Sequence, residues 1–429
     1  MQVPTGPKGT RDFYPEDMSL RQALFGSWRN TCVRYGFEEY DGPMFEHLEL
    51  YTQKSGNEIE KQLYSFEDKG NRMIALRPEL TPTLARMVAA RGNNLKRPVR
   101  WFSIPRLFRY EKMQKGRLRE FFQLNMDILG ITEETADAEL IAASIDMMRD
   151  LGFTKEDFTV HVSSRTLLEE LFAAVGVGNE KLSPLFALLD KRHKIPQEVF
   201  DSELAAIVSP HVSPAVVNDM LNASSLDDLK TIGKPLPSID NIEKLFGLLD
   251  CYGMADFRAF DIGIVRGIAY YTGIVFELFD AKRSMRAIAG GGRYDRLVKL
   301  YGGPETPAVG FAAGDVVLGE MLREKKFAAV VPRSSVFIAS FDERHPERAI
   351  LSAQAIRAAG ISCEFSLRKS SIGKQMEQAN SARAVLVVFV GGDEEKQGNL
   401  RIRNMKSGDE AVIAGSELIA VLKKGLETS

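Results

Sequence analysis

Apolar and polar residues alternate along residues 122–128, and this pattern constrains the fold more than any other part of the sequence. Side chains alternate across a β-strand, so each kind shares one face. The apolar members are Phe122, Leu124, Met126 and Ile128. The polar members are Gln123, Asn125 and Asp127. A strand of this kind belongs in an antiparallel sheet that buries one side. The polar row is then either a solvated sheet surface or the floor of a binding site.

A second strand-like run, residues 99–111, precedes this segment, and a basic loop joins the two. Residues 91–120 contain ten Lys or Arg and two Asp or Glu, although the whole chain has a formal net charge of −2. Such a local excess is either a solvated face or a site for a polyanion. On the first strand Arg109 and Glu111 share a face, from which a guanidinium group can form paired hydrogen bonds to a phosphate or carboxylate.

The length of 429 residues indicates several domains. We expect a first domain over 1–164 and 233–328, interrupted at 165–232 by an irregular helical insertion. A linker at 330–335 leads to a small α/β domain over 333–429, where strand and helix patterns alternate. In the first domain we expect these elements: helices over 22–35 and 137–151, a hairpin turning at 69–71, a helix capped by Thr81, strands over 261–279 and 286–290, and a turn into a helix over 310–322.

Several function classes are disfavoured by what the sequence lacks. It has no run of eighteen apolar residues and no apolar N-terminal core, so we expect neither a membrane span nor a signal peptide. The three cysteines are far apart, which is typical of a reduced, cytoplasmic protein. No histidine cluster has metal-ligand spacing. Neither the dinucleotide-binding fingerprint nor the Walker A sequence is present, so a nucleotide would bind by another route.

The strand–loop–strand segment, FRYE followed by the basic loop and FFQ, resembles motif 2 of the class II aminoacyl-tRNA synthetases. Four further segments are similar to histidyl-tRNA synthetases: GTRDFYP, RPELT, IVRGIAYYTGIVFE and GGGRYD. The resemblance covers nearly the whole chain. It implies an α+β fold, with an antiparallel catalytic sheet flanked by helices, a helical insertion and a C-terminal α/β anticodon-binding domain. It also implies that ATP and L-histidine give histidyl-adenylate and pyrophosphate, and that the histidyl group then passes to the 3′-terminal ribose of tRNA(His).

The resemblance gives roles to residues around ATP. Arg109 and Arg266 would be the catalytic residues, holding the α-phosphate against the histidine carboxylate. The alternative for Arg266 is a structural salt bridge. Four residues would bind the rest of ATP: Glu111 the adenine amino group, Phe121 the adenine ring, and Arg117 and Arg119 the outer phosphates together with Mg²⁺. The alternative for the last two is exposed loop charge.

For histidine, the resemblance implies that Glu79, Thr81 and Gln123 bind the ammonium group. Asp127 and Tyr271, with Tyr270 beside them, would address the imidazole. On a strand Tyr270 and Tyr271 would point to opposite faces, leaving one of them in the core.

Lys112 and Gln114 match loop positions that meet the tRNA acceptor end in this family. Pro43 matches motif 1, which implies a homodimer. No protein metal ligands are expected.

The sequence departs from the family pattern at three positions. Motif 3 usually ends in Gly-x-Glu-Arg, and its arginine lies over adenine and reaches the γ-phosphate; here Val317 takes its place, with Arg286 or Arg293 as candidate substitutes. Asp127 stands where many members have Glu, and Ala269 where many have Asp. These departures leave one alternative open, a non-catalytic histidine-binding paralogue that acts as a regulatory subunit of ATP phosphoribosyltransferase. Such paralogues typically lack the anticodon-binding domain and an intact motif 2 loop.

Overall fold

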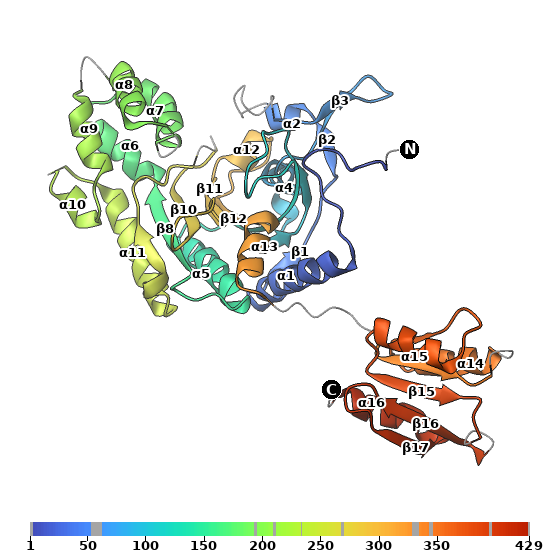
Figure 1. Ribbon diagram of the computed structural model, residues 1–429. Coiled ribbons are helices and arrows are strands. Elements are labelled where there is room, and N and C mark those ends of the chain that lie inside the picture. The colour runs from blue at the N-terminus through green and yellow to red at the C-terminus, as the bar shows by residue number, and fades with distance from the viewer. Residues whose placement is uncertain are drawn as a thin grey trace. The chain divides into compact units, whose positions relative to one another are not determined.

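The computed structural model describes the chain except for residues 1–2, 53–61, 193–194, 209–211, 233, 267–269, 328–333, 343–345, 394–396 and 428–429. It divides into two compact units, Met1–Ala329 and Val330–Ser429 (Figure 1). Most of the expected linker and Ala269 lie outside the described residues. No helix within the described ranges is long and apolar enough to cross a membrane.

A nine-stranded sheet forms the centre of the first unit. In sheet order its strands are β1 (Glu38–Glu39), β5 (Val99–Ser103), β7 (Glu120–Leu129), β12 (Ala308–Gly314), β11 (Ala289–Arg293), β10 (Ile274–Asp280), β8 (Phe158–Ser164) and β9 (Arg258–Phe260), and β6 (Arg106–Phe108) pairs with β7. Among the described strands of this sheet, only the outer pairs β1–β5 and β8–β9 are parallel. The predicted antiparallel sheet is therefore confirmed.

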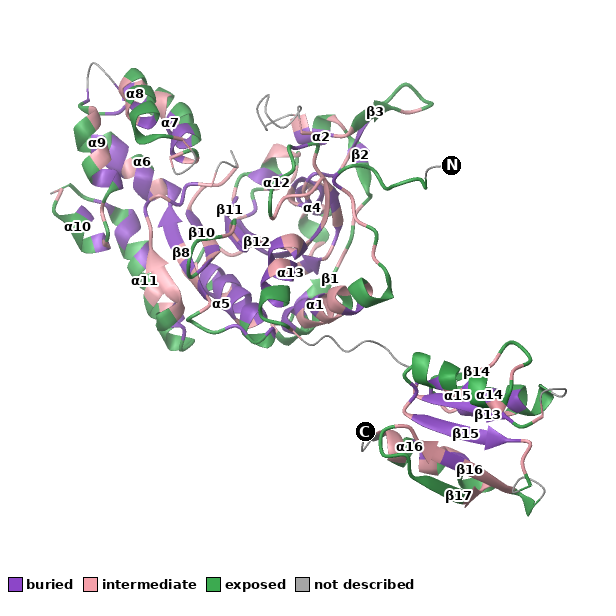
Figure 2. Cartoon of the chain, in the orientation of Figure 1, coloured by how far each residue is buried: buried purple, intermediate pink, exposed green. Residues whose placement is uncertain are grey.

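Four helices cover one face of this sheet: α1 (Pro15–Arg34), α5 (Glu134–Asp150), α11 (Pro237–Cys251) and α13 (Asp315–Glu324). The apolar row of β7 faces them and is at most 9% exposed. Helix α5 is buried along most of its length (Figure 2). The opposite face carries a smaller apolar cluster beneath α4 (Thr81–Arg91) and α12 (Leu297–Leu300), and there the polar row of β7 lies.

Two smaller structures belong to the same unit. The first is a three-stranded antiparallel sheet with the order β2 (Phe45–His47), β4 (Met73–Leu76) and β3 (Ser65–Glu67). It contains the predicted hairpin, formed by β3 and β4. The short helix α2 (Glu49–Thr52) comes just after β2 in the sequence. Within the predicted insertion lie α6 (Arg165–Ala174), α7 (Leu182–Leu189), α8 (Gln197–Val208), α9 (Pro214–Leu221) and α10 (Leu226–Lys230). These helices share an apolar core with the first half of α11. The domain boundaries given above remain predictions.

The second unit is a five-stranded mixed sheet with helices on both faces. Its order is β14 (Cys363–Phe365), β13 (Val336–Ser340), β15 (Leu386–Val390), β16 (Asn399–Asn404) and β17 (Glu410–Ala414). Helices α14 (Glu347–Ala358) and α16 (Leu418–Glu427) contribute to one core, and α15 (Ile372–Ser381) contributes to the other. The predicted alternation of strands and helices is confirmed.

Three local predictions are wrong. Residues 308–314 form strand β12 rather than a turn, because their glycines and alanines hide the usual strand signal of branched side chains. Residues 261–273 are not a strand where they are described, and β10 begins at Ile274. Thr81 is the first residue of α4 rather than its cap, since Leu80 holds the cap position without a side-chain hydrogen bond.

The first strand of the basic hairpin is also shorter than predicted. It divides into β5 and β6 around Pro105, which has no N–H to donate to a sheet. Because β6 ends at Phe108, Arg109 and Glu111 lie just beyond the strand rather than on it. The Arg109 N–H still donates to the carbonyl of Arg119 over 2.9 Å, so the backbone remains anchored there.

Candidate active site

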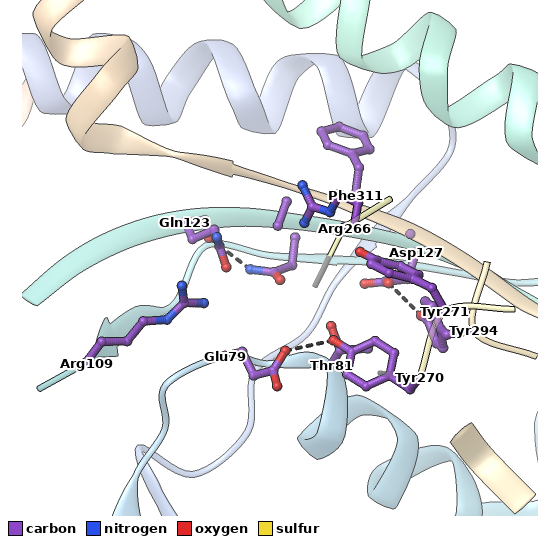
Figure 3. Close-up of a pocket in the computed structure, with 13 residues that line it drawn as sticks. Glu79, Thr81, Arg109, Gln123, Asp127, Arg266, Tyr270, Tyr271, Tyr294 and Phe311 are labelled. Carbon is purple, nitrogen blue, oxygen red and sulfur yellow. Dashed lines mark hydrogen bonds between the residues drawn. The ribbon is translucent and has the colours of Figure 1, made fainter. Parts of the chain in front are cut away.

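Two adjoining cavities open on the polar face of the large sheet. The inner cavity has a volume of about 50 Å³ and is lined by the residues drawn in Figure 3. The outer cavity is larger, about 180 Å³, and lies beside the basic loop and the start of α13. Four residues line both: Arg109, Gln123, Arg266 and Ala312. The two arginines predicted to be catalytic, 157 positions apart in the sequence, therefore meet at the boundary between the cavities.

The polar row of β7 forms one wall of the inner cavity. Gln123, Asn125 and Asp127 all line it, and the last two are only 4% exposed. Gly310 of β12 pairs with Asp127 across the sheet. A Cβ atom at Gly310 would overlap the Asp127 carboxylate. Glycine is therefore required at position 310 if the carboxylate is to lie against the sheet.

Asp127 is held by Tyr294, whose hydroxyl donates to Oδ1 over 2.6 Å (Figure 3). Burial raises the pKa of Asp127 from 3.8 to about 7, and the bond from Tyr294 opposes this shift. Tyr294 is 1% exposed and lines the cavity. Sequence reasoning missed this residue, although it lies in the GGGRYD segment that was singled out.

The opposite wall comes from the start of α4 and from the residues before β10. Tyr270 donates a hydrogen bond of 2.7 Å to Glu79, and Thr81 lies beside them (Figure 3). The pKa of Glu79 is raised, because the effect of burial outweighs the opposing effect of the hydrogen bond from Tyr270. Tyr270 and Tyr271 both line the inner cavity, so the prediction that they point to opposite faces is wrong. They precede β10, where side chains do not have to alternate.

Arg109 and Arg266 reach the boundary in different ways. The Nε of Arg109 donates to the carbonyl of Pro78 over 2.9 Å, and its guanidinium carbon lies 5.2 Å from the centre of the Phe121 ring. Arg266 has a φ of 53° and donates to Glu277 over 2.9 Å. The predicted alternative of a salt bridge for Arg266 is thus present, but the residue also lines both cavities.

The pKa values of these two arginines shift in opposite directions. Burial lowers the pKa of Arg109, partly offset by the nearby Glu79 carboxylate. Burial also acts to lower the pKa of Arg266, but Tyr271, Glu277 and Tyr270 outweigh it and raise the pKa. A Cβ atom at Gly290 would overlap the Arg266 guanidinium, which explains one glycine of the GGGR strand.

The outer cavity collects most of the residues predicted to bind ATP. Glu111, Arg117 and Phe121 line it, and Glu111 forms an ion pair with Arg117. Burial lowers the pKa of Arg117 to about 10, and the positive charges of Arg286 and Arg109 contribute.

Three residues predicted for the loop do not line either cavity. Arg119 lies over the Tyr110 ring at 4.1 Å and approaches the backbone of Glu111. Lys112 and Gln114 are exposed and lie outside both linings.

The structure separates the two candidate substitutes for the missing motif 3 arginine. Arg293 is 7% exposed and pairs with the fully buried Asp137 at 2.6 Å, away from both cavities. Arg286 lines the outer cavity together with Val317. Among the described residues no group of three or more His, Cys, Asp or Glu could hold a metal ion.

An antiparallel sheet of this topology, with the arginine of a strand–loop–strand motif beside the cavities on one face, defines the catalytic domain of a class II aminoacyl-tRNA synthetase. Residues 9–315 match the family model described as histidyl-tRNA synthetase, and residues 329–425 match the anticodon binding domain. The chain belongs to the histidyl-tRNA synthetase family.

Similar proteins extend along nearly the whole chain. A histidine–tRNA ligase from Opitutus terrae is 39% identical over 98% of each chain. The chloroplastic and mitochondrial histidine–tRNA ligase of Arabidopsis thaliana is 40% identical over 96% of this chain and 85% of its own length. The fold matches a crystal structure of histidyl-tRNA synthetase from Nostoc sp. PCC 7120, with a TM-score of 0.80, 22% identity, and coverage of 99% and 100% of the two chains.

Proposed function

We propose that this chain is a histidine–tRNA ligase, which activates histidine with ATP and transfers the histidyl group to the 3′-terminal ribose of tRNA(His). One observation carries the proposal: Arg109 and Arg266 line both an inner cavity of about 50 Å³ and an outer cavity of about 180 Å³. An amino acid in the first and a nucleotide in the second would meet at these two guanidinium groups.

The first step requires a carboxylate to attack an α-phosphate. Both groups are anions, so the site must offset their repulsion and align them, and little other chemistry is needed. Arg109 and Arg266 are anchored through Pro78 and Glu277, so their charges are positioned before the substrates arrive. The histidine carboxylate oxygen forms the new bond to phosphorus as the bond to the β-phosphate oxygen breaks. Pyrophosphate leaves through the outer cavity.

Histidine recognition follows from the walls of the inner cavity. The ammonium group would bind among Glu79, Thr81 and Gln123, where Glu79 supplies a carboxylate. The imidazole offers one donor and one acceptor. We assign Asp127 to the donor nitrogen and Tyr271, with Tyr270 beside it, to the other end of the ring. Because Oδ1 of Asp127 already accepts from Tyr294, its second oxygen is the one left for the ligand.

ATP would place its adenine near Glu111 and Phe121, and its outer phosphates near Arg117. Arg119 would need to leave Tyr110 to join them. Mg²⁺ would arrive bound to the ATP phosphates as part of the substrate. We assign it no side-chain ligand.

For tRNA, the exposed Lys112 and Gln114 would contact the acceptor end, and the second unit would bind the anticodon. We also propose a cytoplasmic homodimer assembled through motif 1. Pro43 lies two residues before the first residue of β2, where Phe45 is 54% exposed, and Phe66 of β3 is 48% exposed. Their partners on β4, Leu76 and Ile74, are two positions apart, so both phenylalanines lie on one face. Burial of such a face by a second copy would stabilise a dimer.

The deciding experiment is histidine-dependent ATP–pyrophosphate exchange, followed by aminoacylation of tRNA(His). We expect both activities. Histidine binding without exchange would instead support the regulatory-subunit alternative. That alternative is disfavoured because residues 329–425 match an anticodon-binding domain. Sedimentation of the purified chain tests the dimer.

A further inference from the structure

Arg286 lies in the segment between β10 and β11 and lines the outer cavity. Its Nη1 donates to the side-chain oxygen of Gln114 over 3.2 Å. Gln114 belongs to the basic loop, so two segments far apart in the sequence meet here. No carboxylate within the described part of the chain forms an ion pair with Arg286. Among the described residues its hydrogen-bond partner is thus a neutral amide, which does not offset the positive charge.

The outer cavity has an excess of positive charge. Four arginines line it, Arg109, Arg117, Arg266 and Arg286, against the single carboxylate of Glu111. Glu111 already pairs with Arg117. Arginines this close repel one another, and the effect of Arg286 in lowering the pKa of Arg117 reflects that repulsion. An anion with several charges, such as a triphosphate, would relieve this repulsion and offer acceptors to these guanidinium groups.

Helix α13, which forms another wall of the outer cavity, contributes the apolar Val317 where the family pattern has a positively charged arginine. Val317 is 5% exposed and lies against the loop tip, where a Cβ atom on Gly116 would be 3.2 Å from Val317 and 3.8 Å from the stem of Arg286. Gly116 has a φ of 75°, so the tip is both tight and restricted to glycine. The tip of the basic loop at Gly116 and the aliphatic part of Arg286 therefore lie close to the short Val317 side chain.

We propose that Arg286 binds the γ-phosphate of ATP and so replaces the motif 3 arginine from a different part of the fold. Arg286 lines the outer cavity but not the inner one, which places it away from the α-phosphate at the boundary. Its charge acts on Arg117, the residue assigned to the outer phosphates. This inference rests on the proposed function, since it requires ATP in the outer cavity.

Titration calorimetry of the full-length chain with Mg·ATP and with AMP tests the inference. For Arg286→Ala we expect about a tenfold or greater loss of ATP affinity, because a hydrogen bond to a charged group is removed. AMP affinity should stay within about twofold, since AMP has no γ-phosphate. Lys282→Ala is the matched control, because Lys282 is an exposed cation of the same segment that lines neither cavity. Unchanged ATP affinity, or equal losses for ATP and AMP, would overturn the assignment.

Exchange kinetics give an independent readout. Pyrophosphate carries the γ-phosphate, so Arg286→Ala should raise the KM for pyrophosphate about tenfold and leave the KM for histidine unchanged. An unchanged KM for pyrophosphate would contradict the proposal. Absence of exchange in the unmodified chain would refute the ligase function itself, whereas the ATP and AMP titrations would still decide the role of Arg286.

Discussion

The phenol of Tyr294 donates a 2.6 Å hydrogen bond to Oδ1 of Asp127, and both side chains are almost completely buried. Asp127 belongs to β7 and Tyr294 directly follows β11, two strands away across β12. The bond fixes the rotation of the carboxylate and leaves its second oxygen for a ligand. The Asp127 carboxylate is thereby held at a defined position.

Tyr294→Phe should weaken histidine binding by about tenfold, because the carboxylate loses the bond that orients it and remains buried. Calorimetric titration with histidine measures this. Tyr301→Phe is the matched control: its hydroxyl donates to the Leu50 carbonyl over 2.7 Å, but the residue lines neither cavity. Both variants should lose about 1 kcal/mol of unfolding free energy. If both lost histidine affinity equally, Tyr294 would have no specific role in the pocket.

The stability of the chain without ligand should depend on pH through Asp127. Its pKa rises from 3.8 to about 7 on folding, so the folded state holds this proton more tightly than the unfolded state. The contribution to stability is complete below about pH 4 and is lost as pH rises to about 7, at about 1.4 kcal/mol per pH unit. The Asp127→Asn substitution should remove this pH-dependent contribution to stability.

Urea unfolding at pH 5 and pH 8 compares Asp127→Asn with the unmodified chain. The asparagine variant should gain stability relative to the unmodified chain as pH rises. Other buried carboxyl groups titrate equally in both proteins, so the difference reports Asp127. Parallel pH profiles would show that this carboxyl group does not take up a proton on folding.

Arg266→Ala should lower the rate of adenylate formation by at least about a hundredfold, with a much smaller loss of histidine affinity. The guanidinium group is needed most where the carboxylate and phosphate charges meet in the transition state. Single-turnover adenylate formation and equilibrium histidine binding separate the two effects. Equal losses in both would assign Arg266 to substrate binding alone.

Gly310→Ala should abolish most histidine binding, because the new methyl group would overlap the Asp127 carboxylate and force it to move. Gly26→Ala in α1 is the control, since a Cβ there meets no atom within 4 Å. That change should stabilise the helix by about 0.5–1 kcal/mol and leave histidine affinity unaltered. Histidine titration and thermal unfolding of both variants test this contrast, and normal binding by Gly310→Ala would show that the carboxylate is free to shift.

The local sequence was sufficient to predict those elements whose pattern of apolar and polar residues is contained within the element itself. The alternation in β7 predicted its buried and polar faces, because side chains of a strand alternate whatever lies on either side. The motifs around Arg109 and Arg266 also identified the family and the fold class. Strand β12 was not predicted because its glycines and alanines lack the usual strand signal, and Gly310 is required by the Asp127 carboxylate on the neighbouring strand rather than by a local preference.

Only the tertiary structure decided which distant groups meet. Tyr294 forms a hydrogen bond with Asp127, and Arg293 forms an ion pair with Asp137. Of the two candidate arginines, only Arg286 lines the outer cavity. Local patterns fix the face on which a side chain lies, but they carry no record of strand order or of which loop crosses a cavity. Hydrogen bonds form only at donor–acceptor distances of about 3 Å, so their partners are set by that packing and not by spacing along the chain.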